Sequence, residues 1–356
     1  MSCLRPTASQ WPSSRLASGL VGLLALAIVA VGCGGGTTES VSVDGSSTVF
    51  PLTEAVAEEF MEDTQGARVN VGVSGTGGGF SKFLRGDIAI NDASRPISPE
   101  EIEKAAQNGV EYIEIPIAYD GLAVVVHPEN DWVECVTAGE LEELWAPNSS
   151  IDRWSQLRDD FPDRPIDLYG PGTASGTYDY FTEAIMGESG ASRSDFTASE
   201  DDNVLVQGIK GTETSLGYFG LAYYENNAGD LKALGVDPDQ PNSGAPCVTP
   251  SAETVQNGTY RPLSRPLFIY VNPAKVTPTV ETFVEFYLQN AGELASDVGY
   301  VAMPDDAYDL ALERFQSRTT GTVFGAEDVD VTGTRVEQML RSAMSDTAAS
   351  DTTAAE

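Results

Sequence analysis

The sequence predicts an α/β fold with two domains around one ligand cleft. Three observations carry this prediction. Segments with strand periodicity alternate with segments of helical periodicity, loops rich in small and hydroxyl-bearing residues follow the strands, and 356 residues exceed the usual size of one domain. In open α/β sheets, ligands bind outside the carboxyl ends of the strands. The hydroxyl-rich loops therefore mark the expected cleft.

The first residues of the chain have the pattern of an export segment. Arginines precede an apolar run at 20–31, which is shorter than the roughly 20 residues that a transmembrane helix needs. The run ends in "VGC", which resembles the lipobox of bacterial lipoproteins. We expect a lipoprotein signal segment over 1–33, lipid on Cys33 and a flexible linker over 34–40. A plain secretory signal is the alternative, and either one predicts an exported protein.

The first block of the chain alternates three strands with helices. Strand patterns occur at 41–43, 68–73 and 88–90, and apolar residues recur with helical spacing over 52–64 and 80–84. Each strand is followed by a loop of small, polar or hydroxyl-bearing residues. The candidate ligand-binding residues of these loops are Ser47, Thr48, Thr76, Gly77, Asp92, Ser94 and Arg95.

A fourth loop of the same chemistry occurs in the second block of the chain. A strand at 166–169 runs directly into "GPGTASGT", ahead of an amphipathic helix. Backbone N–H groups and hydroxyls at a helix N-terminus form an anion-binding arrangement, although an ordinary helix cap explains any one such loop equally well. Four loops of one kind favour a shared ligand site over separate caps. The candidate residues here are Ser175, Gly176 and Thr177.

Two long apolar strands, around 121–126 and 267–271, are expected to cross between the domains. They place domain 1 at 41–120 and 266–324, and domain 2 at 121–265. Asp120 stands where the first crossing strand meets the expected cleft, and it is a further candidate for the site. The last residues, 325–356, form an acidic tail rich in Ser, Thr and Ala that we expect to be partly disordered around one short amphipathic patch.

The charge of the chain excludes several classes of partner. Its 54 acidic and 20 basic residues give a formal net charge of −34. Nucleic acids and anionic membrane surfaces are poor partners for such a protein, so we expect contact with a membrane only through the lipid anchor. The same field opposes the approach of an anionic ligand. An anion site must therefore rely on local donors.

The cysteines predict one disulfide. Beyond the signal segment only Cys135 and Cys247 remain, and two cysteines in an oxidising compartment favour a bond between them, with two buried thiols as the alternative. The chain has a single histidine and no Cys-x-x-Cys pair, so a zinc site of the usual kind is excluded. We expect no metal and no cofactor.

Signals for catalysis are weak. The loop at 172–177 lacks the lysine of a nucleotide-binding P-loop. The histidine, His127, follows a buried strand, and no G-x-S-x-G element precedes it, so we interpret it as structural. The acidic run at 200–202 lacks the ligand spacing of a calcium loop. We expect no enzymatic activity, and an exported phosphohydrolase is kept as the alternative from a different class.

Stretches along the whole mature chain resemble one family. They include "DGSSTVFPLTEAVAEEF", "VGVSGTGGGFSKF", "NDASRPI", "YDGLAVVVHPENDW", "LYGPGTASGTYDYFTEAI", "LGYFGLAYY" and "LSRPLFIYVNP". The chain is similar to PstS, the phosphate-binding lipoproteins of the high-affinity phosphate ABC transporter, and especially to the SphX-like branch. The resemblance implies a type II periplasmic binding protein that captures inorganic phosphate and delivers it to a permease, as a monomer without catalytic activity. A binding protein for another tetrahedral oxyanion, sulfate or arsenate, is the alternative within the class.

The resemblance also implies roles for residues of the loops. The two loops of domain 1 and the Ser-Gly-Thr loop are implied to donate to the ligand. One departure matters, because many relatives carry an arginine just before Ser-Gly-Thr and this chain has none there. Arg95 lies near the position where those relatives have the aspartate that accepts the phosphate proton, so we expect Arg95 to contribute the positive charge. Asp92 and Asp120 are then the candidates for the proton acceptor, and Asp92 is preferred because its loop is the one that departs from the relatives' aspartate.

Overall fold

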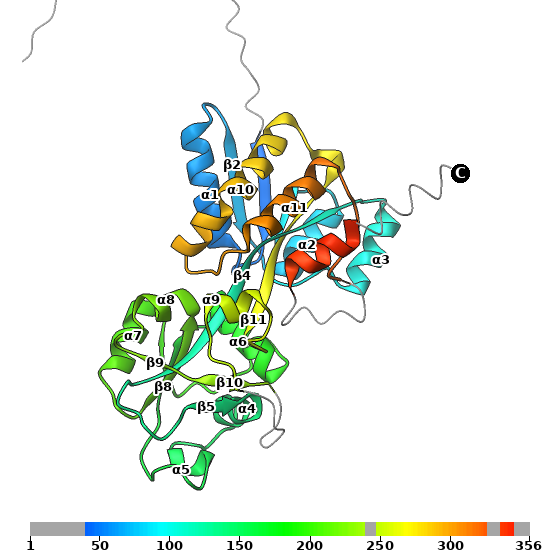
Figure 1. Ribbon diagram of the computed structural model, residues 1–356. Helices are drawn as coiled ribbons and strands as arrows, with labels where there is room; N and C mark the ends of the chain where they lie inside the picture. Colours follow the sequence, from blue (N-terminus) through cyan, green and yellow to red (C-terminus); the bar gives the residue numbers. More distant parts are fainter. Residues whose placement is uncertain (1–39, 239–246, 326–334, 345–356) are drawn as a thin grey trace, which may run out of the picture. The chain divides into compact units, whose positions relative to one another are not determined.

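The structure is a computed structural model that describes residues 40–238, 247–325 and 335–344 (Figure 1). The expected signal segment, the lipid site at Cys33 and all but the last residue of the expected linker lie outside the described residues. Within the described ranges, no helix is both long enough and apolar enough to cross a membrane.

The predicted α/β fold is confirmed. One mixed sheet of nine strands runs through residues 40–325. In spatial order its strands are β2 (Arg68–Val73), β1 (Ser40–Gly45), β3 (Ile90–Ala93), β11 (Ser264–Val271), β4 (Ile113–Val126), β8 (Ser215–Gly220), β6 (Asp167–Pro171) and β7 (Thr197–Ser199), with β9 (Lys232–Ala233) beside β4. A separate two-stranded sheet pairs β5 (Cys135–Thr137) with β10 (Gly235–Asp237).

The long strand β4 links two halves of the sheet. Its first part, 113–121, pairs antiparallel with β11, and its second part, 122–126, pairs antiparallel with β8. The apolar pattern predicted only the second part, because Pro116 and Asp120 interrupt the first. Pro116 is accommodated at a register shift between β4 and β11, which is where a strand tolerates a proline. All residues of β4 are buried.

The strands of the first half, β1, β2 and β3, are parallel, as are β6, β7 and β8 of the second half. Parallel strands require crossover connections, and helices provide them. The helices of the first half are α1 (Phe50–Asp63), α2 (Thr76–Leu84), α3 (Pro99–Asn108), α10 (Pro278–Asp297) and α11 (Asp305–Gln316). Those of the second half are α4 (Ala138–Trp145), α5 (Trp154–Leu157), α6 (Gly176–Met186), α7 (Asp202–Lys210), α8 (Leu221–Asn226) and α9 (Ala252–Gln256) (Figure 1).

The predicted amphipathic patch in the C-terminal tail is a helix, residues 336–344. Its apolar residues Val336 and Leu340 are buried. The backbone N–H of Val336 donates to the Tyr119 hydroxyl on β4 at 3.2 Å. The helix therefore packs onto the strand that connects the two halves.

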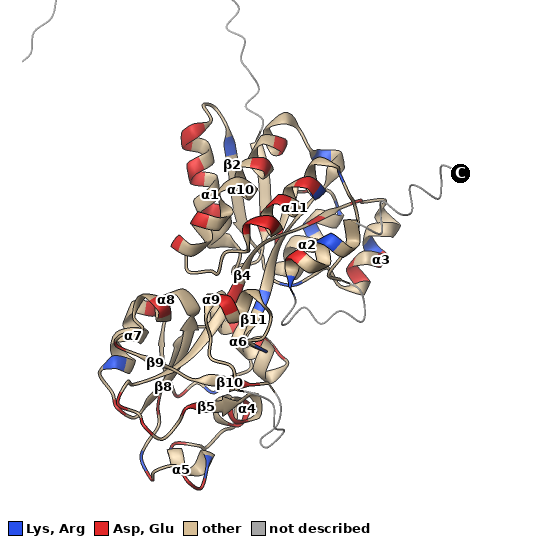
Figure 2. Cartoon of the chain, in the orientation of Figure 1, with Lys and Arg blue, Asp and Glu red and all other residues tan. Residues whose placement is uncertain are grey.

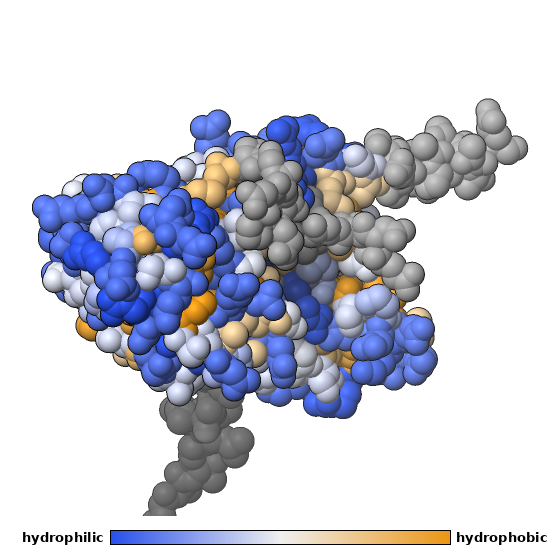
Figure 3. All heavy atoms as spheres, turned by 90° about the horizontal axis from the view of Figure 1, so that it is seen from below, coloured by the Kyte–Doolittle hydropathy of each residue, from blue (hydrophilic) through white to orange (hydrophobic). Residues whose placement is uncertain are grey.

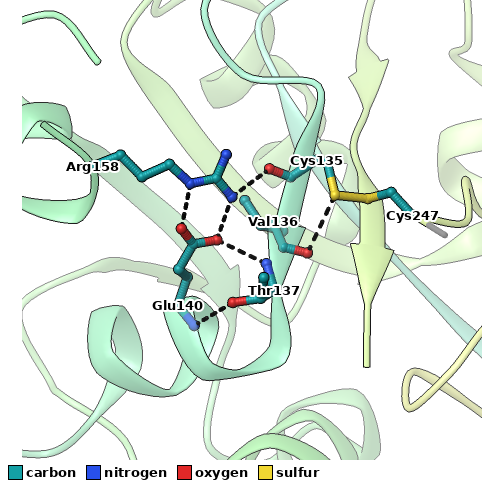
Figure 4. The surroundings of a disulfide bond; sticks show 6 residues. All are labelled: Cys135, Val136, Thr137, Glu140, Arg158 and Cys247. Carbon is teal, nitrogen blue, oxygen red and sulfur yellow. Dashed lines mark hydrogen bonds and ion pairs between the residues drawn. A yellow bond between two sulfur atoms is a disulfide. The ribbon is translucent and has the colours of Figure 1, made fainter. Parts of the chain in front are cut away.

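The predicted disulfide between Cys135 and Cys247 is confirmed (Figure 4). It joins residues 112 positions apart in the sequence, with 6.1 Å between their Cα atoms. Arg158 donates to the Cys135 carbonyl at 3.0 Å and forms a two-pronged ion pair with Glu140, so the loop that carries the disulfide is held by a charged pair as well.

Candidate functional site

The first hydroxyl loop, between β1 and α1, is folded by Ser46. The Ser46 hydroxyl accepts the N–H groups of Thr48 and Val49 at 3.2 and 3.4 Å. Its own N–H donates to the Asp92 carbonyl on β3 at 3.0 Å. Ser46, whose hydroxyl is used within the loop, lines the smaller cavity, whereas Ser47 and Thr48 line both cavities described below.

The second and third loops are joined to each other. The hydroxyls of Thr76 and Ser94 lie 3.1 Å apart, and the Ser94 N–H donates to Thr76 Oγ1 at 3.2 Å. Gly75, which precedes α2, has a φ of +75°, a conformation that side-chain-bearing residues rarely adopt. No side chain among the described residues caps α2, so the amides of its first turn, Gly77 included, remain suited to an anion.

The fourth loop touches the first. The Ser175 hydroxyl caps α6 by accepting the Thr177 N–H at 3.2 Å. A Cβ added to Gly176 would lie 2.4 Å from Thr48 Oγ1 and 2.8 Å from the Thr48 Cα. Only glycine allows this approach. The hydroxyl-rich loops of the two sheet halves therefore approach each other closely.

Two neighbouring cavities lie between these loops, and both are lined by Ser47 and Thr48. The volumes are about 290 and about 210 Å³. Of the predicted residues, the larger cavity is also lined by Asp120, Ser175, Gly176 and Thr177, and the smaller one by Thr76, Ser94 and Arg95. Gly77 lies beside the smaller cavity, with its Cβ position 3.9 Å from Arg95 Nη2.

Asp92 is not brought to the cavities. It is fully buried on β3 and lines neither of them. Neither carboxylate oxygen of Asp92 has a hydrogen-bond partner within the described ranges. Burial raises the pKa of Asp92 from 3.8 to about 8, because the charged form is poorly solvated there. Asp92 thus lies behind the first loop, outside the lining of both cavities.

Asp120 lies on β4 directly opposite Arg265 on β11. Both residues are buried, and Arg265 Nε is 3.6 Å from Asp120 Oδ2. Burial raises the pKa of Asp120 to about 6, and the charge of Arg265 limits that rise. The guanidinium carbon of Arg265 lies 3.7 Å from the centroid of the Tyr180 ring, and Nη1 lies 3.3 Å from Glu183 Oε2.

Arg265 lines the smaller cavity, and the sequence analysis missed it. The sequence contains an indication that Arg265 matters, because it is a charged residue just before an apolar run, in the stretch "LSRPLFIYVNP". A charged residue is rarely buried without a partner or a function. What the sequence does not give is its partner, Asp120, which is distant along the chain.

Arg95 reaches the smaller cavity but is paired. Its Nη1 and Nη2 donate to the two carboxylate oxygens of Glu101 at 2.8 and 3.0 Å. These bonds raise the pKa of Arg95 further above its usual range, although burial opposes them. Arg95 also lies over the Phe80 ring, with 5.5 Å between the guanidinium carbon and the centroid.

Acidic residues occur on elements of both halves of the sheet (Figure 2), and several of them line the two cavities. Asp179 and Glu183 also line the smaller cavity, and Glu200 and Asp202 line the larger one. Burial raises the pKa of Asp202 to about 6, and the charges of Asp201 and Glu200 add to the effect. The described residues contain no group of three or more His, Cys, Asp or Glu side chains placed to hold a metal ion. His127 lines neither cavity.

Comparison with known proteins defines the class. The family described as the PBP superfamily domain matches residues 34–291. The chain belongs to the PBP superfamily. Within it, the chain belongs with the SphX and PstS proteins. "Protein SphX" of Synechocystis sp. is 48% identical over 321 residues, which cover 89% of this chain and 94% of that protein. "Phosphate-binding protein PstS" of Staphylococcus saprophyticus is 38% identical, over 77% of this chain and 86% of that protein.

Two solved structures are also similar to this chain. A possible phosphate-binding protein from Planctomyces limnophilus matches with a TM-score of 0.74 and 43% identity, over 79% of this chain and 99% of that one. A putative phosphate ABC transporter substrate-binding protein from Clostridium perfringens, solved with bound phosphate, matches with a TM-score of 0.52 and 25% identity, over 75% of this chain and 100% of that one.

Proposed function

We propose that this protein captures inorganic phosphate outside the cytoplasm and delivers it to the permease of an ABC transporter. One observation carries the proposal. Hydroxyl-rich loops from both halves of the sheet meet at two adjoining cavities that also contain arginine, in a chain whose relatives are named SphX and phosphate-binding protein PstS. Like its relatives, the protein binds its ligand without transforming it.

Hydroxyls and amides at helix N-termini supply the donors. Ser47, Thr48 and Thr76 contribute from the first half, and the Ser-Gly-Thr loop of α6 contributes from the second. Such donors bind an anion at short range, so the strongly acidic surface of the molecule does not prevent binding. Asp120 is the proposed acceptor for the proton of phosphate, because it is buried, lines the larger cavity and leaves Oδ2 without a hydrogen bond within the described ranges.

The two halves of the sheet act as the two domains of the binding protein, 41–120 with 266–324 and 121–265. β4 and β11 are the crossing strands, and phosphate is enclosed when the domains close. The contact of Gly176 with Thr48 supports this arrangement, since it joins a loop of each half. The protein acts as an exported monomer that is anchored to the membrane by lipid on Cys33.

Calorimetric titration with phosphate, sulfate and arsenate tests the function. We expect reversible binding of about one phosphate per chain and weaker binding of sulfate, because sulfate has no proton to offer a buried carboxylate. No heat with millimolar phosphate would refute the proposal. Preference for sulfate or arsenate would indicate another oxyanion, and turnover of a chromogenic phosphate ester would indicate a phosphohydrolase.

The anchor has its own test. Cells that express the full chain are labelled with a radioactive fatty acid, and a Cys33→Ser variant is the control. Label in the wild type that is absent from the variant supports the lipoprotein. Unlabelled wild type that is released into the medium would indicate a plain secretory signal.

A further inference from the structure

The two arginines of the smaller cavity differ in what their guanidinium groups already bind. Arg95 gives both terminal nitrogens to Glu101, and Nη1 also donates to the Pro96 carbonyl at 3.0 Å. Glu101 in turn accepts the Ser98 N–H at 2.9 Å as part of the capping box of α3. This two-pronged pair engages both terminal nitrogens of Arg95 and compensates its charge.

Arg265 is held more loosely, although it is more deeply buried. Its side chain is 7% exposed, against 35% for Arg95. The nearest carboxylate oxygens, of Asp120 and Glu183, lie at 3.6 and 3.3 Å, which are long for charged hydrogen bonds. Nε has no hydrogen-bond partner among the described residues. Nη1 makes one long hydrogen bond, to Glu183. A buried guanidinium that lines a cavity and keeps an unfilled donor is available to an anion.

We infer that Arg265, and not Arg95, supplies the positive charge that binds phosphate. The inference rests on the proposed function and replaces the expectation from the sequence. Arg265 stacks on Tyr180, so its guanidinium is fixed in the cavity beside Ser47, Thr48 and Thr76. Arg95 instead holds the third loop to α3 through Glu101 and is a positioning residue.

This assignment gives the two crossing strands complementary roles. Arg265 on β11 binds the charge of phosphate, and Asp120 opposite it on β4 accepts the proton. Both groups are buried, where electrostatic interactions are stronger than at a surface. The strands that connect the two halves thus contribute to recognition as well as to closure.

Matched variants test the inference by calorimetric titration with phosphate. Arg265→Met is expected to weaken binding at least about tenfold, the loss of one charge-assisted hydrogen bond. Arg265→Lys, which keeps the charge but not the fork, is expected to fall between Met and wild type. Arg95→Met is expected to lower the melting temperature and change the affinity less than about threefold. Circular dichroism at the titration temperature checks that each variant is folded.

A double variant separates two roles of Arg265. If Arg265 only neutralises Asp120, Arg265→Met is harmful because it leaves a buried charge unpaired, and Asp120→Asn/Arg265→Met then binds phosphate as well as Asp120→Asn alone. If Arg265 binds phosphate, the double variant remains at least about tenfold weaker than Asp120→Asn alone. The double variant also has no unpaired buried charge, so it is expected to fold even if Arg265→Met does not.

The results of these titrations distinguish a failure of the proposed function from a failure of the inference. A wild-type protein that does not bind phosphate contradicts the proposed function. A wild type that binds, together with Arg265 variants of unchanged affinity or a double variant that equals Asp120→Asn, overturns only the inference. A large loss in Arg95→Met with none in Arg265→Met would return the role to Arg95.

Discussion

At the scale of single residues, the site is defined by which buried charges are paired. Arg95 is paired through both terminal nitrogens, Arg265 is loosely paired, and the Asp92 carboxylate has no hydrogen-bond partner within the described ranges. Proximity in sequence to a hydroxyl loop suggested Arg95 and Asp92. The structure distinguishes them, because Arg95 is bound by Glu101 and Asp92 points into the interior behind the loop.

Asp92 is expected to control the pH dependence of stability. Its pKa is raised from 3.8 to about 8, so between these values the folded protein holds a proton that the unfolded chain has lost. The stability that this proton provides is fully present below about pH 4 and is lost as the pH rises to about 8. In urea unfolding between pH 5 and 8, wild type is expected to lose about 1.4 kcal/mol per pH unit relative to Asp92→Asn. Parallel profiles for the two proteins would contradict this.

Glu183 is expected to compete with phosphate. Its side chain is half exposed, and it lies 3.3 Å from Arg265 Nη1. Glu183→Gln removes a negative charge from the cavity wall and is expected to strengthen phosphate binding about twofold to fivefold, the range of one screened ion pair. Glu285→Gln on α10, where Glu285 accepts a hydrogen bond from Gln316, is the matched control and is expected to change nothing. Equal or weaker binding by Glu183→Gln would contradict the idea.

At the scale of elements, the loops and their helices could be predicted because their signals are local. A strand followed by Ser, Thr and Gly and then by a helical period identifies each donor loop without any distant contact. Two elements were predicted incompletely. The capping box of α3, from Ser98 to Glu101, was not part of the prediction. The start of β4 at Ile113 was not predicted either, because charged residues and a proline interrupt the apolar pattern of its first part. The Asp120–Arg265 pair depends on the register of β4 with β11, which no local pattern contains.

Because the first and fourth loops lie in close contact, a methyl group added at Gly176 is expected to weaken phosphate binding. Gly176→Ala would place a Cβ 2.4 Å from Thr48 Oγ1, so the loops must separate. We expect phosphate affinity to fall about tenfold, comparable to the loss of one charge-assisted hydrogen bond, in a protein that remains folded. Gly229→Ala, where a Cβ meets nothing within 4 Å, is the control. Titration of both variants decides the matter, and unchanged affinity in Gly176→Ala would show that the contact is not needed.

At the scale of the whole molecule, the described surface is acidic and mostly hydrophilic, with scattered apolar areas on the face in Figure 3. Such a surface repels a free anion, so an anion site on this molecule depends on local donors. Two arginines attach the C-terminal helix, residues 336–344, to the rest of the molecule. Arg335 donates to the Asn257 carbonyl near α9, and Arg341 pairs with Asp306 on α11, so the helix contacts both halves.

Removal of this helix is expected to destabilise the molecule. A chain that ends at residue 334 loses the buried side chains of Val336 and Leu340. Burial of two such side chains contributes about 3–6 kcal/mol, so the melting temperature should fall by several degrees. A chain that ends at residue 344 keeps the helix and is the control. If both chains melt at the temperature of the full chain, the helix does not stabilise the fold.

The most direct test of the central claim is a crystal structure with phosphate. The account predicts one phosphate between the two halves of the sheet, with hydrogen bonds from Ser47, Thr48 or Thr76 on one side and from Ser175 or Thr177 on the other. It also predicts the Arg265 guanidinium on a phosphate oxygen and the Asp120 carboxylate on its proton. A phosphate held by donors of one half alone, or bound outside the two cavities, would contradict it.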